Sequence, residues 1–104
     1  MNTILLVDDQ KNILRALSLE LKQEGFNILA AQSGFEALQT IANNVVDLIM
    51  LDVAMPEMDG IETLRRIKEL RPNIQVIMMS AQATIEKAVN ATKLGAYDFI
   101  EKGN

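Results

Sequence analysis

The fold is decided by VVDLIMLD, residues 45–52, a nearly continuous apolar run that ends on an acid. The run is too short to span a membrane and too uniformly apolar for a strand with one solvated face. It therefore predicts a buried, central strand of a parallel sheet. Pro56 and Gly60 follow and predict a loop. Asp52 is then expected at the carboxyl end of a strand, the edge where open α/β sheets bind ligands.

Four further apolar runs predict strands that begin near residues 3, 26, 74 and 97, with a helical pattern between each pair of strands. Strands that alternate with helices are typical of right-handed crossovers and a parallel sheet. The expected fold is a doubly wound α/β sandwich with five parallel strands. The sequence stops two residues after Lys102, so we expect the fold to lack a helix after the last strand.

Local signals mark the ends of the predicted helices. Gly25 is expected as the C-cap of the first helix. Ser33 with Glu36 has the form of a capping box, and Asp59 is a cap ahead of the third helix. The fourth helix is predicted to begin near Thr84, to stop at Gly95 and to face inward with three apolar side chains, Ile85, Ala88 and Val89.

Composition narrows the range of functions. The 104 residues suffice for one domain, and the net charge of −4 argues against a nucleic-acid surface, which needs clustered Lys and Arg. The chain has no Cys and no His, which excludes disulfides, thiol chemistry and an internal histidine base. No basic leader or membrane-length apolar run occurs, so we expect a cytoplasmic location and no membrane contact.

Polar side chains follow four of the five predicted strands. Asp8 and Asp9 follow the first strand, Asp52 ends the third, Ser80 ends the fourth and Lys102 follows the fifth. Three carboxylates about 6 Å apart would repel each other by roughly 3 kcal/mol per pair at an effective dielectric constant near 20. Such a cluster needs cations. Lys102 supplies one positive charge. Mg²⁺, which binds through one or two carboxylates and keeps its waters, is suited to balance the remaining negative charge.

Each of these residues also has a structural interpretation. Asp9 could cap the first helix, Asp52 could form a turn beside Pro56, and Ser80 could be a turn hydroxyl. Lys102 taken alone could be a solvated surface cation. Their joint placement at the ends of the correct strands favours a functional site over these readings.

Four motifs resemble the receiver domain of bacterial two-component response regulators. They are LLVDD at 5–9, LDVAMPEMDG at 51–60, MSA at 79–81 and FIEK at 99–102. The resemblance covers the whole chain, residues 1–104, and implies a flavodoxin-like sheet with strand order 2-1-3-4-5. The ending GAYDFIEK, residues 95–102, further resembles receivers attached to AAA+ activators of σ54 transcription.

The resemblance implies a role for each residue at the carboxyl edge. Asp52 would be the phosphoacceptor. Asp9, Asp52 and the backbone carbonyl of Ala54 would ligate Mg²⁺, with Asp8 acting mostly through water. Lys102 would pair with the phosphoryl group, and a separate sensor histidine kinase would be the donor, since the chain has no His.

The resemblance also implies a switch. Ser80 would hydrogen-bond a phosphoryl oxygen after transfer, and Phe99 would be the aromatic side chain that changes rotamer. Ala54 and Gln82 fall where the family tunes the phosphoryl lifetime. The chain would act as a signalling phosphoacceptor that assists its own phosphorylation and dephosphorylation, and the switch would control an output, transcription being the expected one. A carboxylate can store the group as an acyl phosphate, and positioned charge does most of the work of phosphoryl transfer.

The sequence departs from the family at its end. Gly103 stands where the family has a Pro that follows a cis peptide bond, and no fifth helix follows. We expect a trans Lys102–Gly103 bond, because non-proline cis bonds cost about 2.5–4 kcal/mol. An uncovered sheet face would favour self-association, including a homodimer.

Three other classes of protein share part of this pattern. A flavodoxin-like electron carrier would need a Gly-, Ser- and Thr-rich phosphate loop after the first strand, where this chain is acidic. An aspartyl phosphatase dependent on Mg²⁺ would carry its nucleophile after the first strand. A receiver-like interaction module without phosphorylation would usually lack one of the acids or the Lys, and this chain has all of them.

Overall fold

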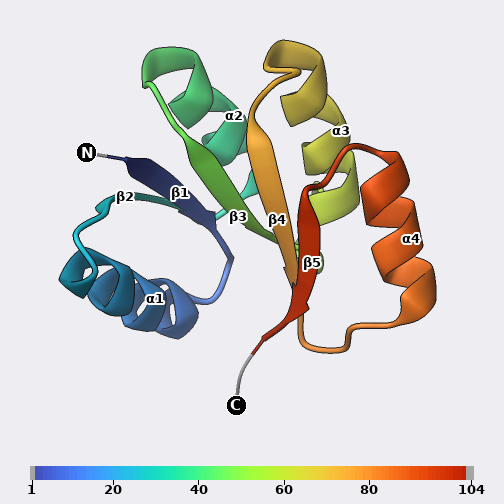
Figure 1. Ribbon diagram of the computed structural model, residues 1–104, viewed down its shortest axis with the longest axis horizontal. Coiled ribbons are helices and arrows are strands. Elements are labelled where there is room, and N and C mark those ends of the chain that lie inside the picture. The colour runs from blue at the N-terminus through green and yellow to red at the C-terminus, as the bar shows by residue number, and fades with distance from the viewer. Residues whose placement is uncertain (1, 103–104) are drawn as a thin grey trace.

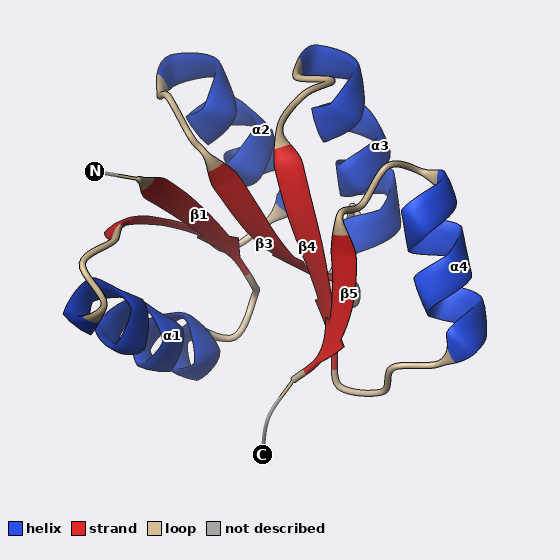
Figure 2. Cartoon of the chain, in the orientation of Figure 1, coloured by secondary structure: helices blue, strands red, loops and turns tan. Residues whose placement is uncertain are grey.

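The alternation of apolar strands and amphipathic helices produces the expected parallel sheet. The computed structural model describes residues 2–102. Within them five strands pair in the order β2-β1-β3-β4-β5, all parallel, which confirms the predicted order (Figures 1 and 2). The elements are β1 (Thr3–Val7), α1 (Lys11–Gln23), β2 (Asn27–Ala31), α2 (Gly34–Asn43), β3 (Leu48–Asp52), α3 (Gly60–Leu70), β4 (Gln75–Ser80), α4 (Ile85–Lys93) and β5 (Asp98–Glu101).

The central strand is shorter than the apolar run predicts. It begins at Leu48, and Val45 is 85% exposed on the connection from α2. Asp47 explains the late start, because its carboxylate accepts a hydrogen bond of 2.7 Å from the backbone N–H of Thr3. The connection thus crosses the amino edge of the sheet before the strand forms, and Asp52 still ends β3 as expected.

Strand side chains alternate between two apolar cores. On β1, Ile4 and Leu6 point to one face and pack with Leu14 of α1. Leu5 and Val7 point to the other face and join the larger core. Figure 1 shows α1 on one side of the sheet and α2, α3 and α4 on the other. Because β1 is buried on both faces, it holds the residues that follow it in fixed positions.

The predicted helix caps are largely present. The Ser33 hydroxyl accepts a hydrogen bond of 3.1 Å from the Glu36 N–H, and the Asp59 carboxylate accepts one of 2.9 Å from the Glu62 N–H. The capping box at Ser33 is only half formed, since the Glu36 carboxylate accepts from Gln32, the residue before the cap. Helix α1 ends at a C-cap one residue earlier than predicted, and Gly25 follows it with a φ of +95°.

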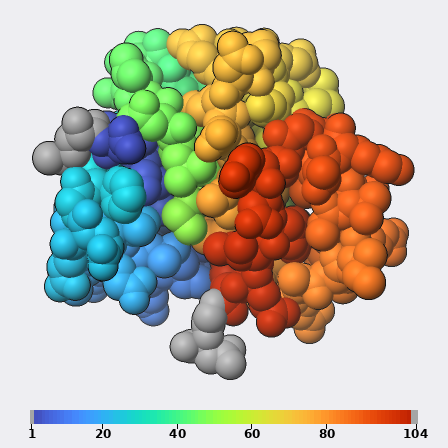
Figure 3. All heavy atoms as spheres, in the orientation of Figure 1, coloured from blue at the N-terminus to red at the C-terminus, as the bar shows by residue number. Residues whose placement is uncertain are grey.

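The inward face predicted for α4 is wrong for Ile85 and Val89. Ile85 is 86% exposed and Val89 is 45% exposed, whereas Ala91 is fully buried against the larger core. The nine-residue helix carries apolar side chains on two sides. Ala91, and Leu94 at the C-cap, pack against the larger core. Tyr97, just before β5, is also 69% exposed. Figure 3 shows β5 at the surface beside α4.

No helix among residues 2–102 is long and apolar enough to cross a membrane. The peptide bond between Lys102 and Gly103, predicted to be trans, lies outside the described residues.

Candidate functional site

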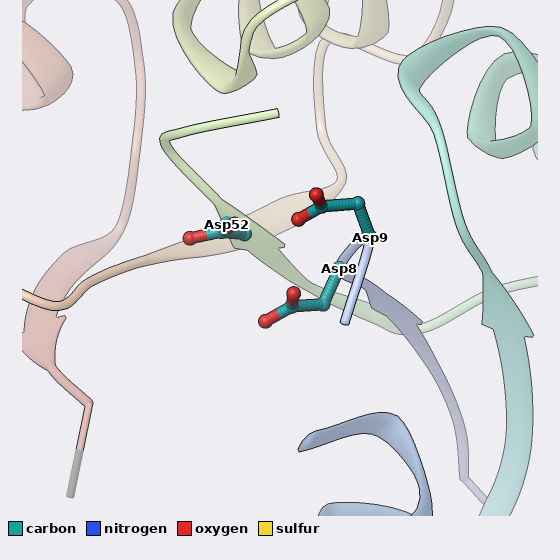
Figure 4. A group of neighbouring side chains, drawn as sticks. All are labelled: Asp8, Asp9 and Asp52. Carbon is teal, nitrogen blue, oxygen red and sulfur yellow. The ribbon is translucent and has the colours of Figure 1, made fainter. Parts of the chain in front are cut away.

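Three carboxylates meet at the carboxyl edge of the sheet. Asp8 and Asp9 follow β1, and Asp52 is the last residue of β3, which pairs with β1. One carboxylate oxygen from each lies within 4.8 Å of the others. Figure 4 shows the three side chains converging from the ends of the two strands. Asp8 is fully buried, Asp52 is 3% exposed and Asp9 is exposed.

The position of Asp8 is fixed by the turn that starts α1. Its N–H donates a hydrogen bond of 3.1 Å to the Ala31 carbonyl at the end of β2. Its Oδ1 accepts one of 2.9 Å from the Gln10 N–H. The alternative role of Asp9 as a helix cap is wrong, because the N-cap residue of α1 is Gln10, without a side-chain cap bond. The Asp9 carboxylate remains available at the rim.

Lys102 joins the two buried carboxylates. Its Nζ lies 2.8 Å from Asp8 Oδ2 and 3.0 Å from Asp52 Oδ1, and its side chain is 13% exposed. Burial lowers the pKa of the Lys102 ammonium, but the hydrogen bonds and charges of both acids outweigh this and raise its pKa above the usual range. Lys102 is therefore a permanent cation in this site.

The surroundings of Asp52 shift the pKa of its carboxyl group. Burial raises the pKa of its carboxyl group and outweighs the opposing hydrogen bond from Lys102, while the negative charge of Asp8 raises the pKa further. Asp8 Oδ2 contacts Lys102 closely but has no partner with normal hydrogen-bond geometry among the described residues. One ammonium therefore leaves the cluster with surplus negative charge.

This donor set fits a hard divalent cation. Oxygen ligands from one or two carboxylates, with room for water, suit Mg²⁺. The exposed Asp9 and the cleft beside it supply that room. The cluster could therefore bind a metal ion.

The loop after β3 is held close against the strand by Gly60. A Cβ atom at this position would lie 2.0 Å from the Asp52 carbonyl oxygen, so only glycine fits without a shift of the backbone. The Gly60 N–H also donates a hydrogen bond of 2.8 Å to the Val53 carbonyl. Ala54, in the same loop, lines the cleft next to Asp52. The tight closure keeps Asp52 and Ala54 together at the site.

Ser80 lies at the end of β4 with its hydroxyl engaged by the following loop. It donates a hydrogen bond of 3.0 Å to the Gln82 carbonyl and accepts one of 3.2 Å from the Gln82 N–H. Glu101 also ties this loop down, because its carboxylate accepts a hydrogen bond of 3.2 Å from the Ala83 N–H. The loop is thus closed on itself, with Ser80 turned toward Gln82.

A cleft of about 520 Å³ opens over these groups. Most of the candidate residues line it, as do Gln10, Ile13 and Lys87, which the sequence analysis missed. Lys87 could have been found from its place three residues after the cap Thr84, which puts it on the first turn of α4. Phe99 is not in the cleft lining but packs half-buried against the larger core. The candidate residues that line the cleft are Asp9, Asp52, Ala54, Ser80, Gln82 and Lys102.

A second hollow of about 490 Å³ lies at the opposite edge of the sheet. Val45 and Leu70 line it, together with Arg71, whose guanidinium donates to the Ile41 carbonyl at 3.2 Å. The described part of the chain places its one group of three potential metal-binding acids at the other edge. The chemistry therefore locates the candidate site in the cleft beside Asp52.

Comparisons with known proteins agree in their assignment. Residues 4–104 match the response regulator receiver domain family. The chain is 44% identical over 99 residues to the transcriptional regulatory protein ZraR of Escherichia coli K12, covering 95% of this chain and 22% of that protein. It is also 44% identical over 101 residues to a putative NtrX-like response regulator of Rickettsia bellii, covering 95% and 21%. The chain thus spans about a fifth of the length of these curated relatives.

Solved structures with the same architecture include two that contain Mg²⁺ and a fluoride of beryllium. A CheX–CheY–BeF₃–Mg²⁺ complex of Borrelia burgdorferi has a TM-score of 0.95 at 36% identity and covers 99% of this chain and 79% of that one. The response regulator TrrA of Thermotoga maritima with Mg²⁺ and BeF has a TM-score of 0.90 at 31% identity and covers 99% and 88%.

Proposed function

Because the chain belongs to the response regulator receiver domain family, we propose that it receives a phosphoryl group on Asp52 and relays this as a change in the surrounding loops. The observation that carries the proposal is the setting of Asp52. It ends a buried strand, contacts Lys102 at 3.0 Å and opens onto a cleft of about 520 Å³. A nucleophile held this way is positioned before its substrate arrives.

In the proposed reaction a carboxylate oxygen of Asp52 attacks the phosphorus of the donor. The new oxygen–phosphorus bond forms as the bond from phosphorus to the donor atom breaks, and that electron pair leaves with the donor. For a phosphohistidine the leaving group is an imidazole nitrogen, and for acetyl phosphate it is acetate. Lys102 holds Asp52 in place and balances part of the negative charge during transfer.

The resident metal would be Mg²⁺, held by Asp9, Asp52 and the Ala54 carbonyl, with Asp8 acting through water. When bound, the ion would neutralise charge on the phosphoryl oxygens. The acidic cluster and its surplus negative charge support this assignment.

After transfer, the Ser80 hydroxyl would leave Gln82 and hydrogen-bond the phosphoryl group. Phe99 would change rotamer as the loop moves. Ala54 and Gln82 would set the lifetime of the acyl phosphate, because both line the cleft onto which Asp52 opens. The chain would in this sense assist its own phosphorylation and dephosphorylation.

We further propose a sensor histidine kinase as the donor and transcription as the output. The chain has no His of its own, so a phosphohistidine has to come from another molecule or region. The relatives are transcriptional regulators several times longer than this chain, which supports an output region outside it. Such a role places the protein in the cytoplasm.

Intact-mass measurement tests the phosphoacceptor directly. The chain is incubated with acetyl phosphate and Mg²⁺, and one phosphoryl group is expected to add. Asp52→Asn should abolish the addition, because the amide is not a competent nucleophile in this reaction. Asp47→Asn is the matched control, since Asp47 lies at the opposite edge and its amide oxygen can still accept from Thr3.

Excess chelator should suppress the addition in the wild-type chain. Equal labelling of Asp52→Asn and Asp47→Asn would contradict the assignment of Asp52. Full labelling in chelator would contradict the requirement for a divalent cation.

A further inference from the structure

Lys87 reaches from α4 to the loop that covers the cleft. Its Nζ donates a hydrogen bond of 3.2 Å to the Gln82 carbonyl, the same oxygen that accepts from the Ser80 hydroxyl at 3.0 Å. Lys87 also lines the cleft with Asp52 and Lys102. Two donors from different elements therefore meet on one carbonyl at the edge of the candidate site.

The position of Lys87 in α4 does not stabilise the helix. Thr84 is the N-cap, and its hydroxyl accepts a hydrogen bond of 3.2 Å from the Lys87 N–H, so Lys87 lies in the first turn. The positive end of the helix dipole lies there and disfavours a cation. Lys93 lies in the last turn, where a cation is favourable. A residue type that is unfavourable for its local secondary structure often belongs to a functional site.

The charges of the site leave room for a second ammonium. Three carboxylates and Lys102 sum to −2, which a divalent cation would bring to zero. Phosphorylation would replace the single charge of the Asp52 carboxylate by a group of about −1.5 to −2. Roughly one negative charge is then unmatched. Lys87 is the other cationic side chain among the described residues that line the cleft.

We propose that Lys87 is a second positioning cation for the phosphoryl group on Asp52, held on the Gln82 carbonyl until that group arrives. This inference rests on the proposed function. The flexible side chain of Lys87 lets its ammonium turn from the carbonyl to a phosphoryl oxygen without unfolding the helix. Because Ser80 would leave the same carbonyl, both donors change partner together. The first turn of α4 is thereby coupled to the chemical state of Asp52.

Binding of beryllofluoride tests the proposal without turnover. With Mg²⁺ present, this fluoride of beryllium is the probe for a phosphoryl group on Asp52, and its affinity can be followed by NMR titration of the chain. Lys87→Met, which keeps the length of the side chain, should weaken the affinity about threefold to tenfold. Lys87→Arg should restore most of it. The loss should shrink at high salt, since the lysine is only partly buried.

Lys93→Met is the matched control because Lys93 is on the same helix but does not line the cleft. It should leave the affinity unchanged. Measuring Mg²⁺ binding without beryllofluoride distinguishes the effect of the lost charge from a structural effect of the substitution. Removing a positive charge at Lys87 cannot weaken the binding of a cation, whereas a disordered loop would weaken both ligands.

The outcomes distinguish the two proposals. If wild-type chain is not labelled by acetyl phosphate, the proposed function fails. If wild-type chain is labelled but Lys87→Met binds beryllofluoride as tightly as Lys93→Met does, the role of Lys87 fails alone. Parallel loss of Mg²⁺ and beryllofluoride binding in Lys87→Met would also overturn it.

Discussion

Two ionic clusters of this molecule use the same kinds of group in opposite surroundings. At the carboxyl edge, Lys102 lies between Asp8 and Asp52, and the three side chains are 13%, 0% and 4% exposed. On the surface of α3, a carboxylate contacts two guanidinium groups that water reaches freely. In the buried cluster the pKa of Asp52 is raised, by burial first, despite the ammonium beside it.

The cluster on α3 behaves in the opposite way. Glu62 contacts Arg66 at 2.8 Å and Arg65 at 2.6 Å, and each of these side chains is more than a third exposed. Hydrogen bonds from Arg65 and then Arg66 lower the pKa of Glu62 to about 2. The three side chains stay in contact with water while they pair.

The difference separates a buried cluster with surplus negative charge from a solvated helix surface. Exposed pairs contribute little to stability, because solvent screens them. Buried acids that outnumber their cations cost stability and keep an unmet affinity for positive charge. The site at the carboxyl edge thus carries unbalanced negative charge before any ligand binds.

The largest effect is expected from Lys102→Met. Removing the ammonium leaves Asp8 and Asp52 buried without a cation, which should lower the free energy of unfolding by about 2–3 kcal/mol. The cost falls below that of a fully enclosed pair because the cleft admits water. Urea denaturation measures the loss. Added Mg²⁺ should restore part of it, and an unchanged midpoint would show that the two acids are already solvated.

A smaller change of opposite sign is expected from Asp52→Asn in chelator. Since the folded pKa of Asp52 is raised above its unfolded value, the folded chain holds a proton more readily than the unfolded one. The wild-type chain therefore gains stability from this group as pH falls from 7 toward the raised pKa. The variant should be more stable than wild type at pH 7, and the difference should shrink as the pH falls toward the raised pKa. A less stable variant at pH 7 would reverse this interpretation.

The smallest effect is expected from Glu62→Gln on α3. The folded pKa of Glu62 is lowered to about 2, so its contribution is present above its unfolded pKa and is lost as pH falls toward 2. Because the group is exposed, its removal should hardly change the urea midpoint at about 0.15 M salt. A loss as large as that of Lys102→Met would remove the distinction between the two clusters.

The sequence predicts well those features that depend on local chemistry. Ser33 and Asp59 cap their helices because a short acceptor before a helical pattern has one favoured partner. The acids and Lys102 meet because parallel strands bring their carboxyl ends to one edge. These predictions needed only the order of the strands and the residues that follow them.

Features that depend on packing were harder to predict. The sequence of α4 places apolar residues on two sides of the helix. Packing against the sheet then determines that Ala91 faces inward and Ile85 faces outward. The late start of β3 follows from the bond between Asp47 and Thr3, which are far apart in the sequence. Lys87 was missed because a single lysine on a helix is usually a solvated cation. The roles predicted for Phe99, Ala54 and Gln82 stay predictions.

The hydroxyl of Ser80 has one proton to give, and the Gln82 carbonyl holds it at 3.0 Å. A hydroxyl that points its proton at that carbonyl does not point it at an oxygen in the cleft. The observed loop arrangement and the one proposed for the phosphorylated chain are for this reason alternatives. A graded input would then change how many molecules have switched, while each molecule is either fully in one arrangement or fully in the other.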